Sequence, residues 1–304
     1  MKNNIFPNLT EEELECDSDA ILPILRSLSA SIHGNIIGID GNDYKLVFLD
    51  RQNPNEARIP IGPTGMKFVA CLYQKLSSNK VYVLKAEEYK DQWKNELIKF
   101  EISEELKLSA KGAGKKTLSE TTGSLQLGSL CELPGERILA TCSSMQNIHL
   151  CDFQKMEINA FKIPVDVTAD TIKYSHTYMS VITGKCDHDL VALIFPHEKE
   201  ILIAAIISSP LVVIKSMKLN ILPNLCLWIS SANALLIANL GGNAGTFIAL
   251  SGGADLTHSE VKFTGDFTEL TSWCILTNET GNETGLLVYD QISNSVLCYE
   301  FNLQ

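Results

Sequence analysis

The chain has 304 residues, of which 45% are hydrophobic and 20% charged, and its formal net charge is −11. This composition is typical of a globular protein with a substantial core. The acidic balance argues against a general binder of nucleic acid or of anionic membranes, because such binding depends on cationic side chains that neutralise phosphates. No apolar run reaches the roughly 18 residues of a membrane-spanning helix, and residues 201–214, interrupted by Ser208, Ser209 and Pro210, are read as two strands.

Residues 1–31 are predicted to form an acidic N-terminal extension, followed by a folded domain over residues 32–304. The spacing of Thr10 and Glu13 is that of a capping box and predicts a short helix over 10–16. A second helix is predicted around 20–28, with Pro23 in its first turn. A dense group of carboxylates in this extension is the candidate partner-binding site; the alternative is a solvated tail. The group consists of Glu11, Glu12, Glu13, Glu15, Asp17 and Asp19.

The chain starts without the apolar stretch of a secretory signal. Its nine cysteines are scattered, and none forms a C-x-x-C pair. A disulfide framework or a zinc knuckle is therefore not expected, and a reducing compartment, cytosolic or nuclear, is predicted.

From Ile32 onward the hydrophobic period changes to two. Residues 36–39 and 44–49 flank an Asp-Gly turn, which predicts a hairpin. Similar strand pairs flank turns at 77–79, 184–189 and 231–233, and this spacing is typical of an all-β fold. Two segments differ. Residues 87–100 have helical spacing and are predicted to be a helix or a long strand of an ordinary blade, whereas the polar residues 106–122 are predicted to be an exposed loop.

The segment from Leu130 to Phe153 alternates three apolar runs with two turns, as in an antiparallel meander. It resembles one repeat of the WD40 β-propeller family, with an L-A-T-x-S strand and with Cys151 in place of the Trp of Trp-Asp. Segments that close at Asp50 and Asp290 resemble the same repeat. The resemblance implies a single β-propeller, and at about 40–45 residues per blade the length fits six or seven blades. A pair of β-sandwiches is the alternative.

Motifs that could carry chemistry are incomplete. Residues 112–117 lack the first Gly and the hydroxyl of a phosphate loop, and residues 241–245 lack the spacing of a dinucleotide fingerprint. Asp187, His188 and Asp189 are interpreted as a turn rather than a metal site, and His149 with Cys151 as ordinary strand positions rather than a nucleophilic pair. The sequence therefore predicts no catalytic residue, no cofactor and no metal, and a protein that is not an enzyme.

The resemblance implies a non-enzymatic interaction scaffold that binds other proteins as a subunit of a larger complex. Direct nucleic-acid binding and membrane insertion are not expected, and no small-molecule substrate is identified. Two alternatives stay open: a propeller enzyme of hydrolase or lactonase type with a site in the central funnel, and a reader of short basic peptides on an acidic face. We also expect the first and last strands of the chain to lie in the same or adjacent blades, and Cys151 to be a buried, unreactive thiol.

Overall fold

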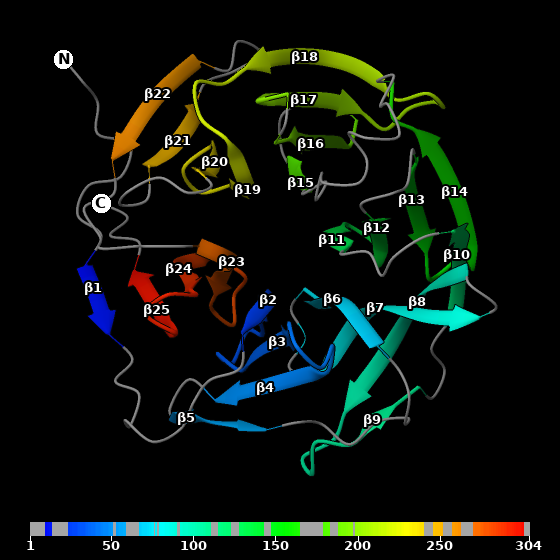
Figure 1. The fold of residues 1–304 in the computed structure, drawn as a ribbon, viewed down its shortest axis with the longest axis vertical. Helices are drawn as coiled ribbons and strands as arrows, with labels where there is room; N and C mark the ends of the chain where they lie inside the picture. Colours follow the sequence, from blue (N-terminus) through cyan, green and yellow to red (C-terminus); the bar gives the residue numbers. More distant parts are fainter. Residues whose placement is uncertain are drawn as a thin grey trace.

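A computed structural model gives the fold of the chain. It describes residues 10–13, 24–50, 53–58, 67–75, 77, 79–89, 92–110, 115–122, 128–142, 147–164, 179–182, 188–196, 198–239, 246–251, 257–262 and 270–300. The secondary-structure elements of these residues are β-strands, and they form six antiparallel sheets around a central axis (Figure 1). The fold is therefore all-β with a propeller arrangement, as predicted, and not a pair of sandwiches. No helix in the described part is long and apolar enough to span a membrane.

Each sheet is one blade, numbered here along the chain. Blade 1 consists of β2 (Leu25–Ala30), β3 (Ile36–Asp40), β4 (Leu46–Asp50) and β5 (Asn53–Arg58). Blade 2 consists of β6 (Lys67–Tyr73), β7 (Lys80–Tyr89), β8 (Gln92–Ile102) and β10 (Lys115–Thr122), with β9 (Leu108–Ser109) also paired to β8. Blade 3 consists of β11 (Gly128–Leu133), β12 (Arg137–Cys142), β13 (Asn147–Asp152) and β14 (Glu157–Lys162).

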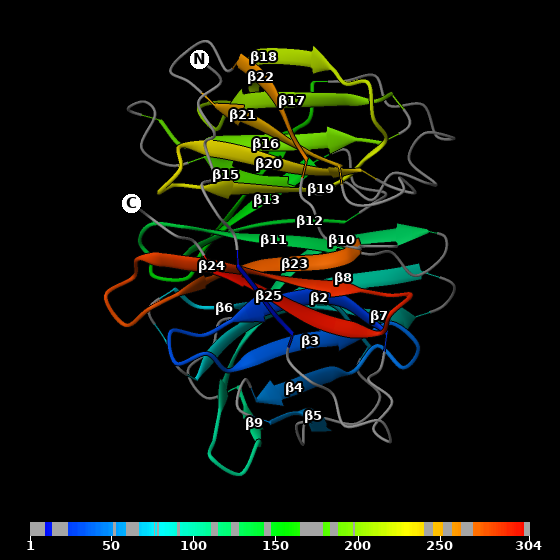
Figure 2. The ribbon, with the colours of Figure 1, turned by 90° about the vertical axis from the view of Figure 1, so that its left-hand side faces the viewer.

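The second half of the chain repeats this plan. Blade 4 consists of β15 (Met179–Ile182), β16 (Leu190–Phe195), β17 (Glu200–Ala205) and β18 (Val212–Lys218). Blade 5 consists of β19 (Pro223–Ile229), β20 (Ala234–Asn239), β21 (Thr246–Ser251) and β22 (Thr257–Lys262). Blade 6 consists of β23 (Leu270–Thr277), β24 (Glu283–Asp290), β25 (Ser295–Glu300) and, from the other end of the chain, β1 (Thr10–Glu13). In side view, the inner strands β11 and β23 lie near the middle of the molecule (Figure 2). The outer strands β18 and β22 lie near its top and the outer strand β5 near its bottom.

The inner strands of each blade are apolar because neighbouring blades cover both of their faces. In β16 all six side chains are buried. Leu190, Ala192 and Ile194 pack towards blade 5, whereas Val191 and Leu193 pack towards blade 3. A strand buried on both faces loses the polar alternation of a half-exposed strand, and each large apolar side chain so buried contributes about 1.5–3 kcal/mol to folding.

The first and last strands pair within blade 6, which confirms the predicted meeting of the chain ends. β1 runs antiparallel to β25, with Thr10 opposite Glu300 and Glu13 opposite Leu297. The helix predicted over 10–16 is therefore wrong for residues 10–13. A capping box is a local signal of about 1 kcal/mol, and the unpaired edge of β25 offers the same residues a ladder of backbone hydrogen bonds instead.

The helix predicted around 20–28 is also wrong in its described part, because Leu25 to Ala30 form β2. The register of β2 against β3 shifts between Leu25 and Leu28. This irregularity places both leucines in one core cluster although they are three residues apart. A bulged strand thus imitates the spacing of a helical face.

The two atypical segments of blade 2 are strands as well. Residues 87–89 and 92–100 lie in the paired strands β7 and β8, so the strand alternative holds there and the helix does not. The loop predicted over 106–122 is wrong, because it contains β9 and β10. Leu118, 8% exposed, belongs to the core cluster between blades 2 and 3 and sits at a register shift of β10. Leu118 is the only large apolar residue between Ala110 and Thr122, so the sequence of this segment has little apolar periodicity to detect.

Candidate functional site

One strand from each blade lines a central channel with a volume of about 320 Å³. These strands are β2, β6, β11, β15, β19 and β23, the first strand of each blade. The wall of the channel combines serine and cysteine side chains with leucine, methionine and tryptophan. A cavity of this size falls at the lower end of the range of ligand pockets, about 300–1,000 Å³.

The serine hydroxyls of the channel wall join neighbouring blades. Ser29 of blade 1 accepts a hydrogen bond from the backbone N–H of Tyr73 in blade 2, at 2.8 Å. Ser180 of blade 4 accepts one from the N–H of Trp228 in blade 5, also at 2.8 Å. Both bonds are buried, so each satisfies a backbone donor that no water can reach.

Further hydrogen bonds of the channel wall join blades 1 and 2, blades 6 and 1, and blades 3 and 4. The N–H of Cys71 donates to the Ser27 hydroxyl at 3.2 Å, and the Ser272 hydroxyl donates to the carbonyl of Leu25 at 3.3 Å. The Cys131 thiol donates to the carbonyl of Met179 at 3.1 Å.

These contacts reveal a repeat that the sequence analysis missed. A serine or cysteine is followed by an apolar residue and then by serine, cysteine or an aromatic residue. The pattern occurs at 27–29, 71–73, 129–131, 226–228 and 272–274. Its spacing of two places the first and third residues of each triplet on one face of the strand. A search for this pattern would have located the first strands of five blades.

The thiols of the channel wall are protonated at neutral pH. Burial raises the pKa of Cys71 to about 12, against a weaker lowering by the hydrogen bond with Ser27. Burial likewise raises the pKa of Cys131 to about 12 and raises that of Cys226 and Cys274. Because the thiolate is the reactive species, these cysteines act as small packing groups.

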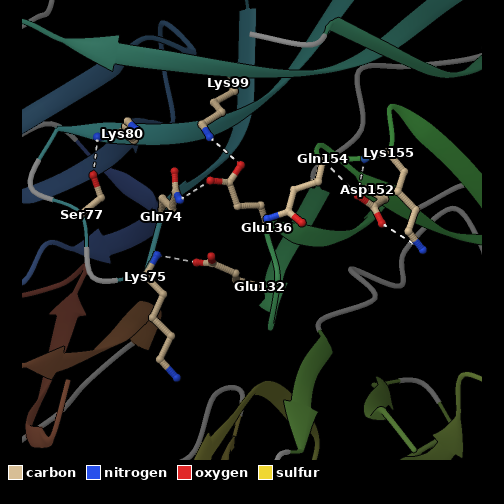
Figure 3. Close-up of polar contacts among 10 residues, drawn as sticks. All are labelled: Gln74, Lys75, Ser77, Lys80, Lys99, Glu132, Glu136, Asp152, Gln154 and Lys155. Carbon is tan, nitrogen blue, oxygen red and sulfur yellow. Dashed lines mark hydrogen bonds and ion pairs between the residues drawn. The ribbon is translucent and has the colours of Figure 1, made fainter. Parts of the chain in front are cut away.

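A polar cluster joins blades 2 and 3 (Figure 3), and its residues Gln74, Lys75 and Glu132 line the channel. Glu136 accepts hydrogen bonds from Lys99 at 3.0 Å and from the Gln74 amide at 3.1 Å. The bond from Lys99 lowers the pKa of Glu136. Glu132 accepts a bond of 2.5 Å from the backbone N–H of Lys75, but burial raises its pKa. The cluster therefore uses its carboxylates to fix the β6–β7 turn against blade 3.

The predicted acidic binding site is only partly described. Glu11, Glu12 and Glu13 lie in β1, opposite Tyr299, Cys298 and Leu297 of β25. Glu15, Asp17 and Asp19 lie outside the described residues. Three of the six acidic residues thus belong to the outer strand of blade 6, and their role in partner binding stays a prediction.

The residues of the incomplete sequence motifs are described in part, and the described ones are buried or hydrogen-bonded. Asp189 accepts a hydrogen bond from Arg137 at 2.8 Å, which joins blades 3 and 4, whereas Asp187 is outside the described residues. Cys151 is fully buried, as predicted. His149 is also buried, and burial lowers its pKa. Glycines 112, 114, 241, 242 and 245 lie outside the described residues. Among the residues that are described, no group of three or more His, Cys, Asp or Glu side chains could hold a metal ion.

An apolar surface on the outer edge of blade 4 is the most unusual exposed feature. It consists of Ile207, Val212, Val213 and Ile214, which are 52%, 41%, 44% and 56% exposed, and is called the rim patch below. Three of these residues are consecutive in β18, so apolar side chains are exposed on both faces of the strand. Sequence analysis recognised the strand but not its exposure, since an apolar run looks the same in a buried strand.

No protein-family model and no curated protein sequence matches the chain. Solved structures share its fold. The aldose sugar dehydrogenase of Streptomyces coelicolor, in its PQQ-bound form, has a TM-score of 0.62 at 12% identity over 97% of this chain and 99% of its own. Virginiamycin B lyase of Staphylococcus aureus has a TM-score of 0.57 at 11% identity, over 97% and 100%. The WD40 repeats of RRP9 have a TM-score of 0.54 at 8% identity, over 91% and 80%.

These similarities establish the β-propeller fold. They support the WD40 resemblance only at the level of that fold. They also overturn the prediction that the protein is not an enzyme, because propellers of the same fold, matched over nearly their whole length, include a dehydrogenase and a lyase. The missing catalytic motifs were a poor guide, since a propeller gathers side chains from distant blades.

Proposed function

We propose that the chain is a protein-binding propeller of WD40 type that contributes to a multiprotein complex through the rim patch. The observation that carries this proposal is the exposed Val212-Val213-Ile214 run on an outer strand. Contiguous exposed apolar surface commonly marks a protein interaction site, because its burial against a partner removes it from water.

The polar groups of the channel wall support the same assignment. The hydroxyls of Ser29 and Ser180 accept hydrogen bonds from neighbouring blades. These groups hold the disc together. A rigid disc of blades then presents the outer strands as a fixed surface.

Quantitative co-purification from cells of the native source tests the proposal. The tagged full chain would be compared with a Val213→Lys/Ile214→Lys variant and with Ile292→Lys as control. Ile292 is 65% exposed in the β24–β25 turn of blade 6. Ile292→Lys therefore also replaces an exposed apolar side chain by lysine, but on a different blade. We expect specific partners to be lost only from the rim variant, with unchanged thermal unfolding in all three proteins. Partners retained by the rim variant would contradict the proposal.

A further inference from the structure

β18 has an open edge. In the described part of the structure it pairs only with β17, and it forms the outer strand of blade 4 (Figure 1). The outer strand of a sheet presents a row of backbone N–H and C=O groups with which another extended chain can pair. The register shifts between Ile203 and Ala204, because Ala204 lies opposite Val213 and Ile203 opposite Lys215. Ile214 is the extra residue of this bulge.

Both ends of β18 are fixed to the body of the protein. Before the strand, the N–H of Leu211 donates to the carbonyl of Lys162 at 2.9 Å, and Leu211 is buried. After it, the N–H of Leu219 donates to the carbonyl of Lys199 at 2.7 Å, and Leu219 is buried as well. The edge is thus held in an extended conformation before any partner arrives, which lowers the entropy cost of pairing.

The charge around β18 differs in sign from that of the whole chain. Residues 154–164 and 198–218, which form β14, β17, β18 and their turns, contain five lysines and three glutamates, whereas the chain carries −11. Lys218 is paired with Glu200 at 2.7 Å, and Lys155 is paired with Asp152 at 4.0 Å. Lys162 and Lys199 are exposed near the two ends of the strand. Acidic residues flanking a bound segment would be attracted to this surface.

We infer that β18 binds an extended segment of a partner protein that is apolar at alternate positions and flanked by acidic residues, and that this segment adds a further strand to blade 4. The inference rests on the proposed function and names the class of partner. Backbone hydrogen bonds along the edge supply affinity, whereas the contacts of Val212, Val213 and Ile214 with alternate side chains supply specificity.

Three synthetic peptides test this inference on the full chain. The first has a core of alternating valine and threonine with two glutamates at each end. The second is identical but N-methylated at alternate backbone nitrogens, so that it keeps the side chains and loses the donors. The third carries lysines in place of the glutamates. We expect the first to bind at least tenfold more tightly than the other two, more tightly at low salt, and with slowed amide hydrogen exchange in β18.

Several outcomes would overturn the inference. If the N-methylated peptide binds as tightly as the first peptide, strand pairing is excluded. If the lysine peptide binds as tightly as the first peptide, a preference for acidic flanking residues is excluded. A dimer in sedimentation that the Val213→Lys/Ile214→Lys change abolishes would assign the edge to a second copy of the chain. If no peptide binds while the rim variant still loses its native partners, the strand-pairing inference fails and the proposed function stands. If the rim variant retains those partners, the proposed function fails.

Discussion

Ser180 is a residue whose role can be isolated, because its hydroxyl accepts one buried hydrogen bond from the N–H of Trp228 in the next blade. Ser180→Ala would leave that donor buried without this acceptor, at a cost of about 1–3 kcal/mol. We expect the free energy of unfolding, measured in denaturant, to fall by this amount. Ser293→Ala, at an exposed turn position, is the matched control and should change it by no more than about 0.5 kcal/mol. Equal effects of the two changes would show that the bond between blades contributes nothing.

Glu136 gives a prediction for the pH dependence of stability. Its pKa is lowered in the folded protein, first by the hydrogen bond from Lys99. A carboxyl group whose pKa is lowered by folding stabilises the folded state at pH values above its pKa in the unfolded chain. This contribution is lost as the pH falls through its pKa in the folded protein. Glu136→Gln should therefore destabilise the protein at pH 7, and the difference from the unsubstituted chain should shrink between pH 5 and pH 3. Unfolding curves at several pH values measure it, and a difference that persists at pH 3 would assign the effect to packing.

At the scale of the elements, local patterns predicted the central strands well and the peripheral ones poorly. The run Ile138 to Cys142 is β12, because residues between two blades must be apolar on both faces. β1 and β2 were predicted as helices because a capping box and a bulged leucine pair are local signals, whereas the edge of β25 and the register of β3 are supplied by distant residues. The rim patch could not be predicted either, since exposure depends on where a strand lies in its sheet.

β1 itself gives a prediction at this scale. Deleting residues 1–18 removes the strand that covers β25, so the free energy lost with this pairing should lower the melting temperature by several degrees. The bare edge of β25 should also make the protein more prone to aggregation. Differential scanning calorimetry and light scattering measure the two effects.

Deletion of residues 1–9 is the control, because it leaves β1 in place. It should melt like the full chain. If deletion of 1–18 leaves the melting curve unchanged as well, the pairing of β1 with β25 does not contribute to stability in solution.

For the whole molecule, closure depends on the last strand of the chain. β25 lies between β24 and β1, so it is the link through which the two ends of the polypeptide meet in one blade. Val296, Cys298 and Tyr299 of this strand are buried between blade 6 and its neighbours. The hydroxyl of Ser272, on the first strand of the same blade, is bonded to blade 1. Blade 6 therefore connects the beginning and the end of the ring.

Removing residues 295–304 deletes β25 and leaves β1 without its partner, so blade 6 keeps only two of its four strands. Two-stranded hairpins have marginal stability in water, and the contacts between blade 6 and blade 1 involve side chains of the deleted strand. We therefore expect the truncated chain to lose the cooperative unfolding transition of the full chain, as followed by calorimetry and by the far-UV circular dichroism signal. Removing only residues 302–304, beyond the end of β25, should preserve that transition. A truncated chain that unfolds at the same temperature and with the same enthalpy as the full chain would show that the ring does not need its closing strand.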